Sequence, residues 1–165
     1  ELQITGVGKA PSNGLRNGAI VNIEAATSSV KSAIEAAEMM AGHEVLSLFT
    51  AIGGSQVSSM NSTGVVGVAG NGKGIQEITH KDVDRVIEAA KSVPIDIART
   101  IIHVIPQSFT IDGQKGIKQP LNMIGVRLES EIHIVTAAVT SIQNLRSCVT
   151  RAGFGCDGIL LKTLA

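Results

Sequence analysis

Residues 100–136 read TIIHVIPQSFTIDGQKGIKQPLNMIGVRLESEIHIVT and carry the most regular pattern in the chain. In the second half of this stretch, apolar residues alternate with charged residues, which is typical of a strand with one buried face. The first half predicts another strand, which ends at the turn signal Asp112-Gly113. Pro106 has no amide to donate, so we expect a bulge or an edge position there. The two strands are expected to face each other as a hairpin-like pair, with the rest of the chain arranged around them.

Three segments with apolar residues at helical spacing predict helices. Each begins at a residue whose side chain can accept a hydrogen bond from the first free amides of a helix. Two of the three also have the spacing of a capping box, in which the third helical residue reaches back to the cap. A glycine or a proline then ends each helix. The expected starts and ends are Asn22 and Gly42, Thr79 (paired with Asp82) and Pro94, and Thr140 (paired with Gln143) and Gly153.

Short apolar runs predict further strands between these helices. Both ends of the chain alternate strands with helices, whereas the middle reads strand, helix, strand, strand, which is α+β in character. We therefore expect an α/β fold into which an α+β module is inserted. The expected additional strands lie at 2–7, 45–52, 56–61, 64–68 and 159–161.

The composition excludes several classes of function. The chain has 14 basic and 14 acidic residues, so no net field attracts it to nucleic acid or to an anionic membrane. Aromatic residues make up only 2%, which removes the stacking platforms that single-stranded nucleic acid needs. Cys148 and Cys156 show neither a disulfide framework nor metal spacing, which favours a reducing compartment. The sequence shows no signal peptide and no apolar run of about 18 residues.

One segment matches a catalytic motif in part. Residues 67–73, GVAGNGK, have the spacing of a phosphate-binding loop and follow an expected strand. Gly74 stands where that motif needs Ser or Thr for Mg²⁺, and the next helix begins only at Thr79. The segment is therefore interpreted as a connecting loop. His103 and His133 are interpreted as cross-strand polar residues rather than metal ligands. We predict no catalytic, cofactor-binding or metal-binding residue in this chain.

Several segments together resemble the FtsA family of bacterial cell division proteins. The resemblance runs nearly from end to end of the chain and is most specific in its central third. The matching segments are PSNGLRNG at 11–18, ITHKDV at 78–83, HVIPQ at 103–107, Asp112, GIKQP at 116–120 and GVRLE at 125–129.

This resemblance implies a partial actin-like (ribonuclease H-like) sheet-and-helix lobe that carries a strand–helix–strand–strand subdomain. Residues 1–43 and 131–165 would be parts of the first large subdomain, and 44–130 would be the inserted subdomain called 1C. FtsA-type proteins link the tubulin-like division ring to the membrane and recruit later septal proteins. The insert is the part tied to self-association and recruitment. The resemblance also implies a cytoplasmic protein that is peripheral on the inner membrane at the division site.

The resemblance further implies that this chain is a piece of a longer protein. The family's first phosphate hairpin would precede Glu1, and its adenosine motif, ring contact and membrane helix would follow Ala165. ATP and Mg²⁺ thus belong to the full-length family, and we expect no cofactor, no membrane contact and no direct ring contact here. A strand at 2–7 would have a bare edge, which we expect a second copy to cover.

We therefore expect a non-enzymatic interaction module with two candidate contact residues. Arg127 lies on the polar face of a half-buried strand, and Val65 lies on a short strand that is expected at a sheet edge. The expected partners are further copies of the protein and later division proteins, but not nucleic acid. One alternative is a nucleotide-dependent enzyme. Another is the actin-like ATP-binding protein of type IV pilus assembly, although the segments at 11–14 and 103–107 favour the division protein.

Overall fold

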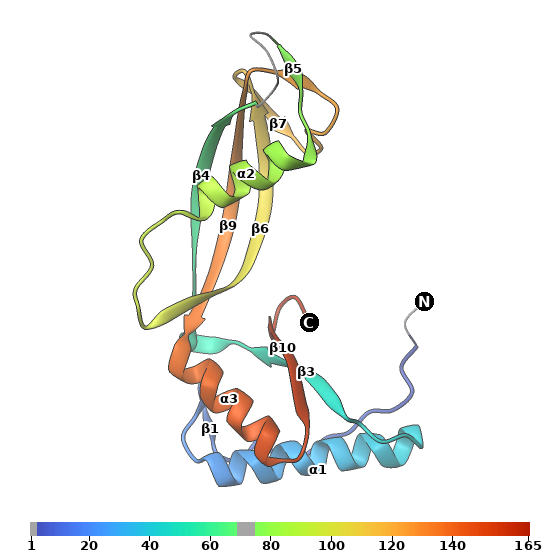
Figure 1. Cartoon of the computed structure of the whole chain (residues 1–165). Coiled ribbons are helices and arrows are strands. Elements are labelled where there is room, and N and C mark those ends of the chain that lie inside the picture. The colour runs from blue at the N-terminus through green and yellow to red at the C-terminus, as the bar shows by residue number, and fades with distance from the viewer. Residues whose placement is uncertain (1–2, 69–74) are drawn as a thin grey trace. The chain divides into compact units, whose positions relative to one another are not determined.

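The computed structural model describes residues 3–68 and 75–165. These residues form a mixed α/β structure with three α-helices and several small sheets (Figure 1). The chain divides into two compact units, each of which combines segments that are distant in the sequence. The first unit comprises Glu1–Ser58, Ala98–Thr100 and Ala137–Ala165, and the second comprises Ser59–Ile97 and Ile101–Thr136.

The longest helix of the first unit, α1 (Ile23–Ala41), confirms the prediction at both of its ends. The side chain of Asn22 accepts a hydrogen bond of 3.0 Å from the amide of Ala25, which satisfies one of the free amides of the first turn. Gly42 has a φ of 69°, in the left-handed region, and donates its amide to the carbonyl of Glu38 at 2.8 Å. A small antiparallel hairpin, β1 (Leu15–Arg16) and β2 (Ala19–Ile20), precedes the helix.

The prediction of a strand at 2–7 is wrong, because residues 3–7 have no regular secondary structure. Among the described residues no strand pairs with this segment, so its backbone joins no ladder. The segment instead passes close to α1, where a Cβ added at Gly6 would lie 2.5 Å from the carbonyl oxygen of Ala37. The expectation that a second copy covers this strand therefore has no structural basis.

A parallel pair of strands and a third helix complete the first unit. β3 (Ser47–Ile52) pairs with β10 (Gly155–Leu161), and α3 (Val139–Arg151) precedes β10. The prediction of a capping box at Thr140 and Gln143 is wrong. The N-cap residue of the helix is Ala138, and no side chain makes a capping hydrogen bond there. Thr140 is already inside the helix, since the preceding strand runs on to Ala138 and passes directly into α3.

The second unit is built on one four-stranded sheet with the strand order β4-β9-β6-β7. The two short strands expected at 56–61 and 64–68 form one continuous strand, β4, which follows the short 3-10 helix η1 (Gly54–Gln56). Two small strands, β5 and β8, pair with each other outside this sheet. The strands of the unit are β4 (Val57–Gly67), β5 (Gln76–Glu77), β6 (Arg99–Ile111), β7 (Gln114–Ile117), β8 (Ile124–Gly125) and β9 (Arg127–Ala138).

The two strands of residues 100–136 are β6 and β9, and they are neighbours in the sheet as expected. They do not form a hairpin with each other. The Asp112-Gly113 turn instead joins β6 to β7, with Phe109 opposite Ile117, while β9 lies on the other side of β6. The pairing of β6 with β7 begins at Phe109, so Pro106 lies in a part of β6 that β7 does not reach.

Helix α2 (His80–Lys91) covers one face of this sheet and buries its core (Figure 1). The predicted capping box is confirmed: the Asp82 carboxylate accepts hydrogen bonds from the Thr79 amide at 3.0 Å and the Thr79 hydroxyl at 2.7 Å. The helix approaches β4 closely at Gly64, where an added Cβ would lie 2.3 Å from the carbonyl oxygen of Val86. The buried apolar residues around α2 are Ile78, Val86, Ala90, Phe109, Ile111, Leu128, Ile132 and Ile134.

Candidate interaction surface

The face of the sheet opposite α2 carries the candidate contact residues. Along β9 the buried residues Leu128, Ser130 and Ile132 alternate with Arg127, Glu129 and Glu131, which lie on the other face. Val65 lies on β4, the outermost strand on one side of the sheet, with a side chain that is 45% exposed. The structure thus places Val65 on an edge strand and Arg127 on the polar face of a half-buried strand.

Two contacts define how β4 lies against β9. The amide of Val68 donates to the carbonyl of Val126 at 2.8 Å, and the side chains of Asn61 and His133 meet at 2.6 Å between Oδ1 and Nδ1. Both contacts fit one antiparallel register, in which Val65 lies opposite Glu129.

Arg127 lies on the same face of β9 as Glu129. Its Nε lies 3.1 Å from Oε1 of Glu129, and its side chain is 60% exposed. Because Glu129 lies opposite Val65 in this register, the three side chains form one continuous patch of an apolar, an acidic and a basic group. The two candidate contact residues therefore lie on one surface, which we call the Val65–Arg127 patch.

The backbone under Arg127 is held by Asp112, a role that was not predicted from the sequence. Asp112 has a φ of 47°, in the left-handed region. Its carboxylate accepts hydrogen bonds from the amides of Val126, at 3.1 Å, and Arg127, at 2.8 Å. The available signal was an aspartate that opens a turn and has no acidic partner, since such a side chain often bonds to backbone amides.

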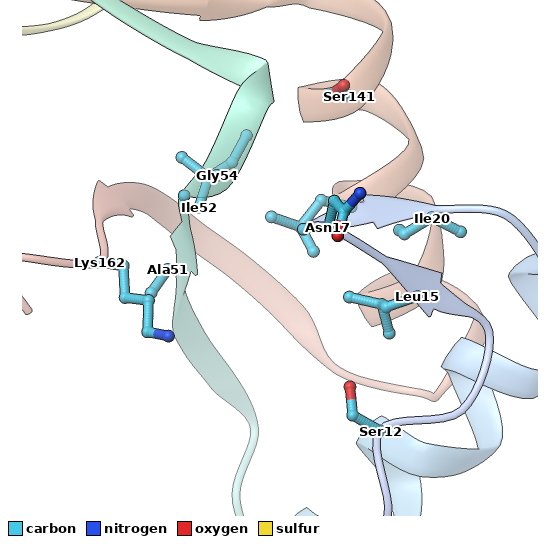
Figure 2. A pocket seen from close by; sticks show the side chains of 12 residues that line it. Ser12, Leu15, Asn17, Ile20, Ala51, Ile52, Gly54, Ser141 and Lys162 are labelled. Atoms are coloured by element: carbon cyan, nitrogen blue, oxygen red, sulfur yellow. The ribbon is translucent and has the colours of Figure 1, made fainter.

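The first unit contains a cavity of about 520 Å³ at the carboxyl ends of the parallel strands β3 and β10 (Figure 2). Figure 2 shows residues of the β1–β2 hairpin, among them Leu15 and Asn17, across the cavity from the end of β3. Open α/β sheets commonly bind ligands beyond the carboxyl ends of their strands. The lining includes the cationic Lys162 and the polar Ser141, while no group of acidic, histidine or cysteine side chains that could hold a metal occurs among the described residues.

The segment 67–73, which has the spacing of a phosphate-binding loop, extends into residues outside the described part of the chain. Its interpretation as a connecting loop therefore stays a prediction. In residues 3–68 and 75–165, no helix is both long enough and apolar enough to cross a membrane.

Comparison with known proteins gives the family. The model of the SHS2 domain inserted in FTSA matches residues 54–136, which is half of the chain. The chain belongs to the FtsA family. FtsA is a cell division protein of the actin-like family, so the resemblance seen in the sequence is confirmed.

Individual relatives match nearly the whole chain. The cell division protein FtsA of Borreliella burgdorferi is 48% identical over 165 residues, which is all of this chain and 39% of the relative. FtsA of Pseudomonas aeruginosa is 40% identical over 165 residues, and this chain covers 38% of its length. FtsA of Bacillus subtilis is 39% identical over 164 residues, and this chain covers 37% of its length. The chain therefore spans less than two fifths of the length of these relatives.

A solved structure gives the fold class. The structure of the PilM-PilN type IV pilus biogenesis complex matches 93% of this chain and 38% of its own chain, with a TM-score of 0.53 and 15% sequence identity. At this identity the match shows a shared fold and not a shared function. The FtsA chain thus has a mixed α/β architecture that contains an SHS2 domain and resembles the actin-like PilM in fold.

Proposed function

We propose that the second unit of this FtsA chain mediates self-association and the recruitment of later division proteins. The observation that carries the proposal is the Val65–Arg127 patch, which lies on the face of the sheet that α2 leaves open and borders the edge strand β4. An edge strand offers backbone groups to an extended partner segment, and an exposed arginine offers a charged anchor beside it.

The wider role proposed for the full-length protein is to link the tubulin-like division ring to the membrane. This chain spans 39% of its Borreliella burgdorferi relative, so that role is proposed for the whole protein and not for this part alone. We propose a location on the cytoplasmic face of the inner membrane at the division site. ATP and Mg²⁺ are proposed to act in the full-length family and not to bind this chain.

The proposed subdomain boundaries follow the FtsA resemblance. Residues 1–43 and 131–165 would form part of an actin-like first large subdomain, and 44–130 would form the 1C-type insert. The match to the PilM structure supports an actin-like lobe, and the order β4, α2, β6, β9 in the second unit supports a strand–helix–strand–strand insert. The family model begins at residue 54 and the compact second unit at Ser59, so limited proteolysis of the region 44–58 would test where the insert begins.

The alternative function, in type IV pilus assembly, receives less support. The PilM structure is 15% identical to this chain, whereas the Borreliella burgdorferi FtsA is 48% identical. That solved structure is a complex of PilM with PilN. We infer from this only that a fold of this kind can serve as a docking partner for another protein.

The experiment that tests the proposal introduces negative charge on the patch. We expect Val65→Glu and Arg127→Glu in the full-length protein to weaken self-association, measured by sedimentation velocity, and to weaken capture of later division proteins. Ile97→Glu and Arg146→Glu are matched controls at exposed positions outside the patch, and both should behave as the parent. If the patch variants bind their partners and themselves as well as the controls do, the patch is not the contact.

A further inference from the structure

We propose that β4 pairs with β4 of a second copy in antiparallel orientation, with the two-fold axis at Ser62. This inference rests on the proposed function and names both the partner and the contact for self-association. The pairing would join two four-stranded sheets into one continuous sheet across the edge beside the Val65–Arg127 patch.

The backbone of β4 is arranged for such a partner. In an antiparallel ladder, residues bonded to the neighbouring strand alternate with residues whose N–H and C=O groups point away from it. The amide of Val68 bonds to the carbonyl of Val126, so the residues at odd positions of β4 point their backbone groups away from β9. In the part of the chain that the structure describes, no further strand lies beyond β4. In the central part of the strand, the residues that present edge-pointing backbone groups are Ser59, Asn61, Thr63 and Val65.

The strand also lacks the usual features that protect an edge. Natural sheets protect their edges with charged side chains, prolines, bulges or very short strands. β4 is 11 residues long, and its sequence VSSMNSTGVVG contains no charged residue and no proline. The side chains of Ser59, Asn61, Thr63 and Val65 are exposed. A second strand can therefore approach without meeting a buried charge or a steric block from these residues.

A two-fold axis at Ser62 makes β4 complementary to itself. It places Asn61 of one copy opposite Thr63 of the other and Ser59 opposite Val65, so every edge-pointing residue meets another edge-pointing residue. This is an isologous contact, in which one surface serves both copies, and it closes as a dimer. No other register of the segment Ser59–Val65 aligns all four of these residues.

The charges on the neighbouring strand agree with this register. In the β4–β9 register, Glu131 lies beside Thr63 and His133 lies beside Asn61. The two-fold axis places Thr63 of one copy opposite Asn61 of the other. Glu131 of one copy and His133 of the other therefore lie on the same line across the joined sheet, on either side of this pair. The paired sheets thus bring no like charges into line, which favours a second copy over a partner segment of strong net charge.

Disulfide trapping tests the register in full-length protein with Cys156→Ser in the background. Ser62→Cys should form a cross-linked dimer under mild oxidation, because residues directly opposite each other have Cβ atoms about 4.5–5.5 Å apart. Met60→Cys is the matched control on the same strand. Its two copies would lie about 14 Å apart along the strand, beyond the reach of a disulfide, so it should stay uncrosslinked.

A second pair of variants tests the backbone contact without cysteine chemistry. Thr63→Pro removes one edge-pointing amide but no hydrogen bond to β9, and it should raise the dissociation constant of the dimer by at least about tenfold. Thr63→Val keeps the amide and should leave that constant unchanged. Circular dichroism during heating shows whether each variant is folded, and sedimentation equilibrium measures the dissociation constant.

The outcomes separate this inference from the proposed function. If Ser62→Cys does not cross-link while Val65→Glu still abolishes self-association, the patch acts by another contact and the strand pairing is wrong. Cross-linking at Met60 instead of Ser62 would overturn the register. If Thr63→Pro removes binding of a division protein but not the dimer, the edge receives a segment of that protein and the second-copy assignment fails.

Discussion

At the scale of single residues, the second unit depends on side chains that hold backbone in place. Asp112 reads in the sequence as a turn former and as one residue of the FtsA resemblance. In the structure its carboxylate bonds to the amides of Val126 and Arg127, and so fixes the start of β9 and the position of the Arg127 side chain. Gly64 acts in the opposite way, because the absence of a side chain there allows α2 to approach β4.

The first prediction concerns Asp112. Asp112→Ala should lower the free energy of unfolding by about 1–2 kcal/mol, since it removes the charged acceptor of two backbone amides. It should also weaken any binding that depends on Arg127, because the backbone under Arg127 loses its anchor. Asp84→Ala, at an exposed position of α2, is the matched control and should change stability little. Chemical denaturation of both variants measures the difference, and equal stabilities would contradict the assigned role.

The second prediction compares two glycines on the same strand. Gly64→Ala should destabilise the protein by about 1–3 kcal/mol, because the new Cβ would lie 2.3 Å from the carbonyl oxygen of Val86 and would force α2 away from the sheet. Gly67→Ala should have little effect, since no atom lies within 4 Å of its added Cβ. Thermal unfolding of the two variants provides the measurement. A similar loss in both would show that strand propensity, and not helix packing, accounts for the effect.

At the scale of elements, capping rules predicted helices well where the cap lies in a loop and poorly where a strand continues into the helix. Thr79 ends a short irregular segment, so its amide and hydroxyl are free to bond with Asp82. Thr140 has the same spacing to Gln143, yet it is already helical because β9 extends to Ala138. The capping-box spacing therefore forms a cap where an irregular segment precedes the helix, as at Thr79. It does not form one where a strand runs directly into the helix, as at Thr140.

The third prediction follows from this difference. Thr79→Ala should lower the free energy of unfolding by about 1 kcal/mol, because it removes the hydroxyl donor to Asp82 at the start of α2. Thr140→Ala has the same chemistry at an exposed position and should change stability by less than about half as much. Denaturant unfolding, monitored by circular dichroism, would detect the contrast. A larger loss at Thr140 would mean that the predicted second capping box does form in solution.

At the scale of the whole molecule, the chain combines two units whose chemistry differs. The first unit contains the parallel strands and the cavity at their carboxyl ends, while the second contains an open sheet face and a neutral edge strand. The proposed function assigns the first unit to an actin-like lobe and the second unit to a contact surface. The FtsA family gives this arrangement a context, and the PilM fold match extends it beyond that family.

The fourth prediction concerns nucleotide. Isothermal titration of this chain with ATP and Mg²⁺ should give no heat of binding, because we propose that ATP and Mg²⁺ act in the full-length family and do not bind this chain. Lys162 lines the cavity at the ends of β3 and β10 and offers one positive charge to an anion. If heat is observed, Lys162→Ala shows whether the cavity binds the nucleotide. Any heat of binding by the parent chain would contradict the prediction.

Much of this protein is determined by patterns within a few residues of sequence. The helix α1 with its caps Asn22 and Gly42, the capping box of α2, and the alternation along β9 all depend on spacing that one segment contains by itself. The family resemblance is likewise carried by short segments. Each of these features could be predicted because hydrogen bonds between neighbours and hydrophobic periodicity act locally.

The remaining features required the tertiary structure, because they depend on which distant segments become neighbours. Residues 3–7 have strand-like composition but no partner, and Val57–Gly67 became one edge strand because β9, some 70 residues away, pairs along it. The bond from Asp112 to Arg127 and the joining of Val65, Glu129 and Arg127 into one patch arise in the same way. Strand pairing is non-local, so the partner of a strand cannot be predicted from the sequence of that strand alone. Only the folded sheet shows which strand lies at its edge.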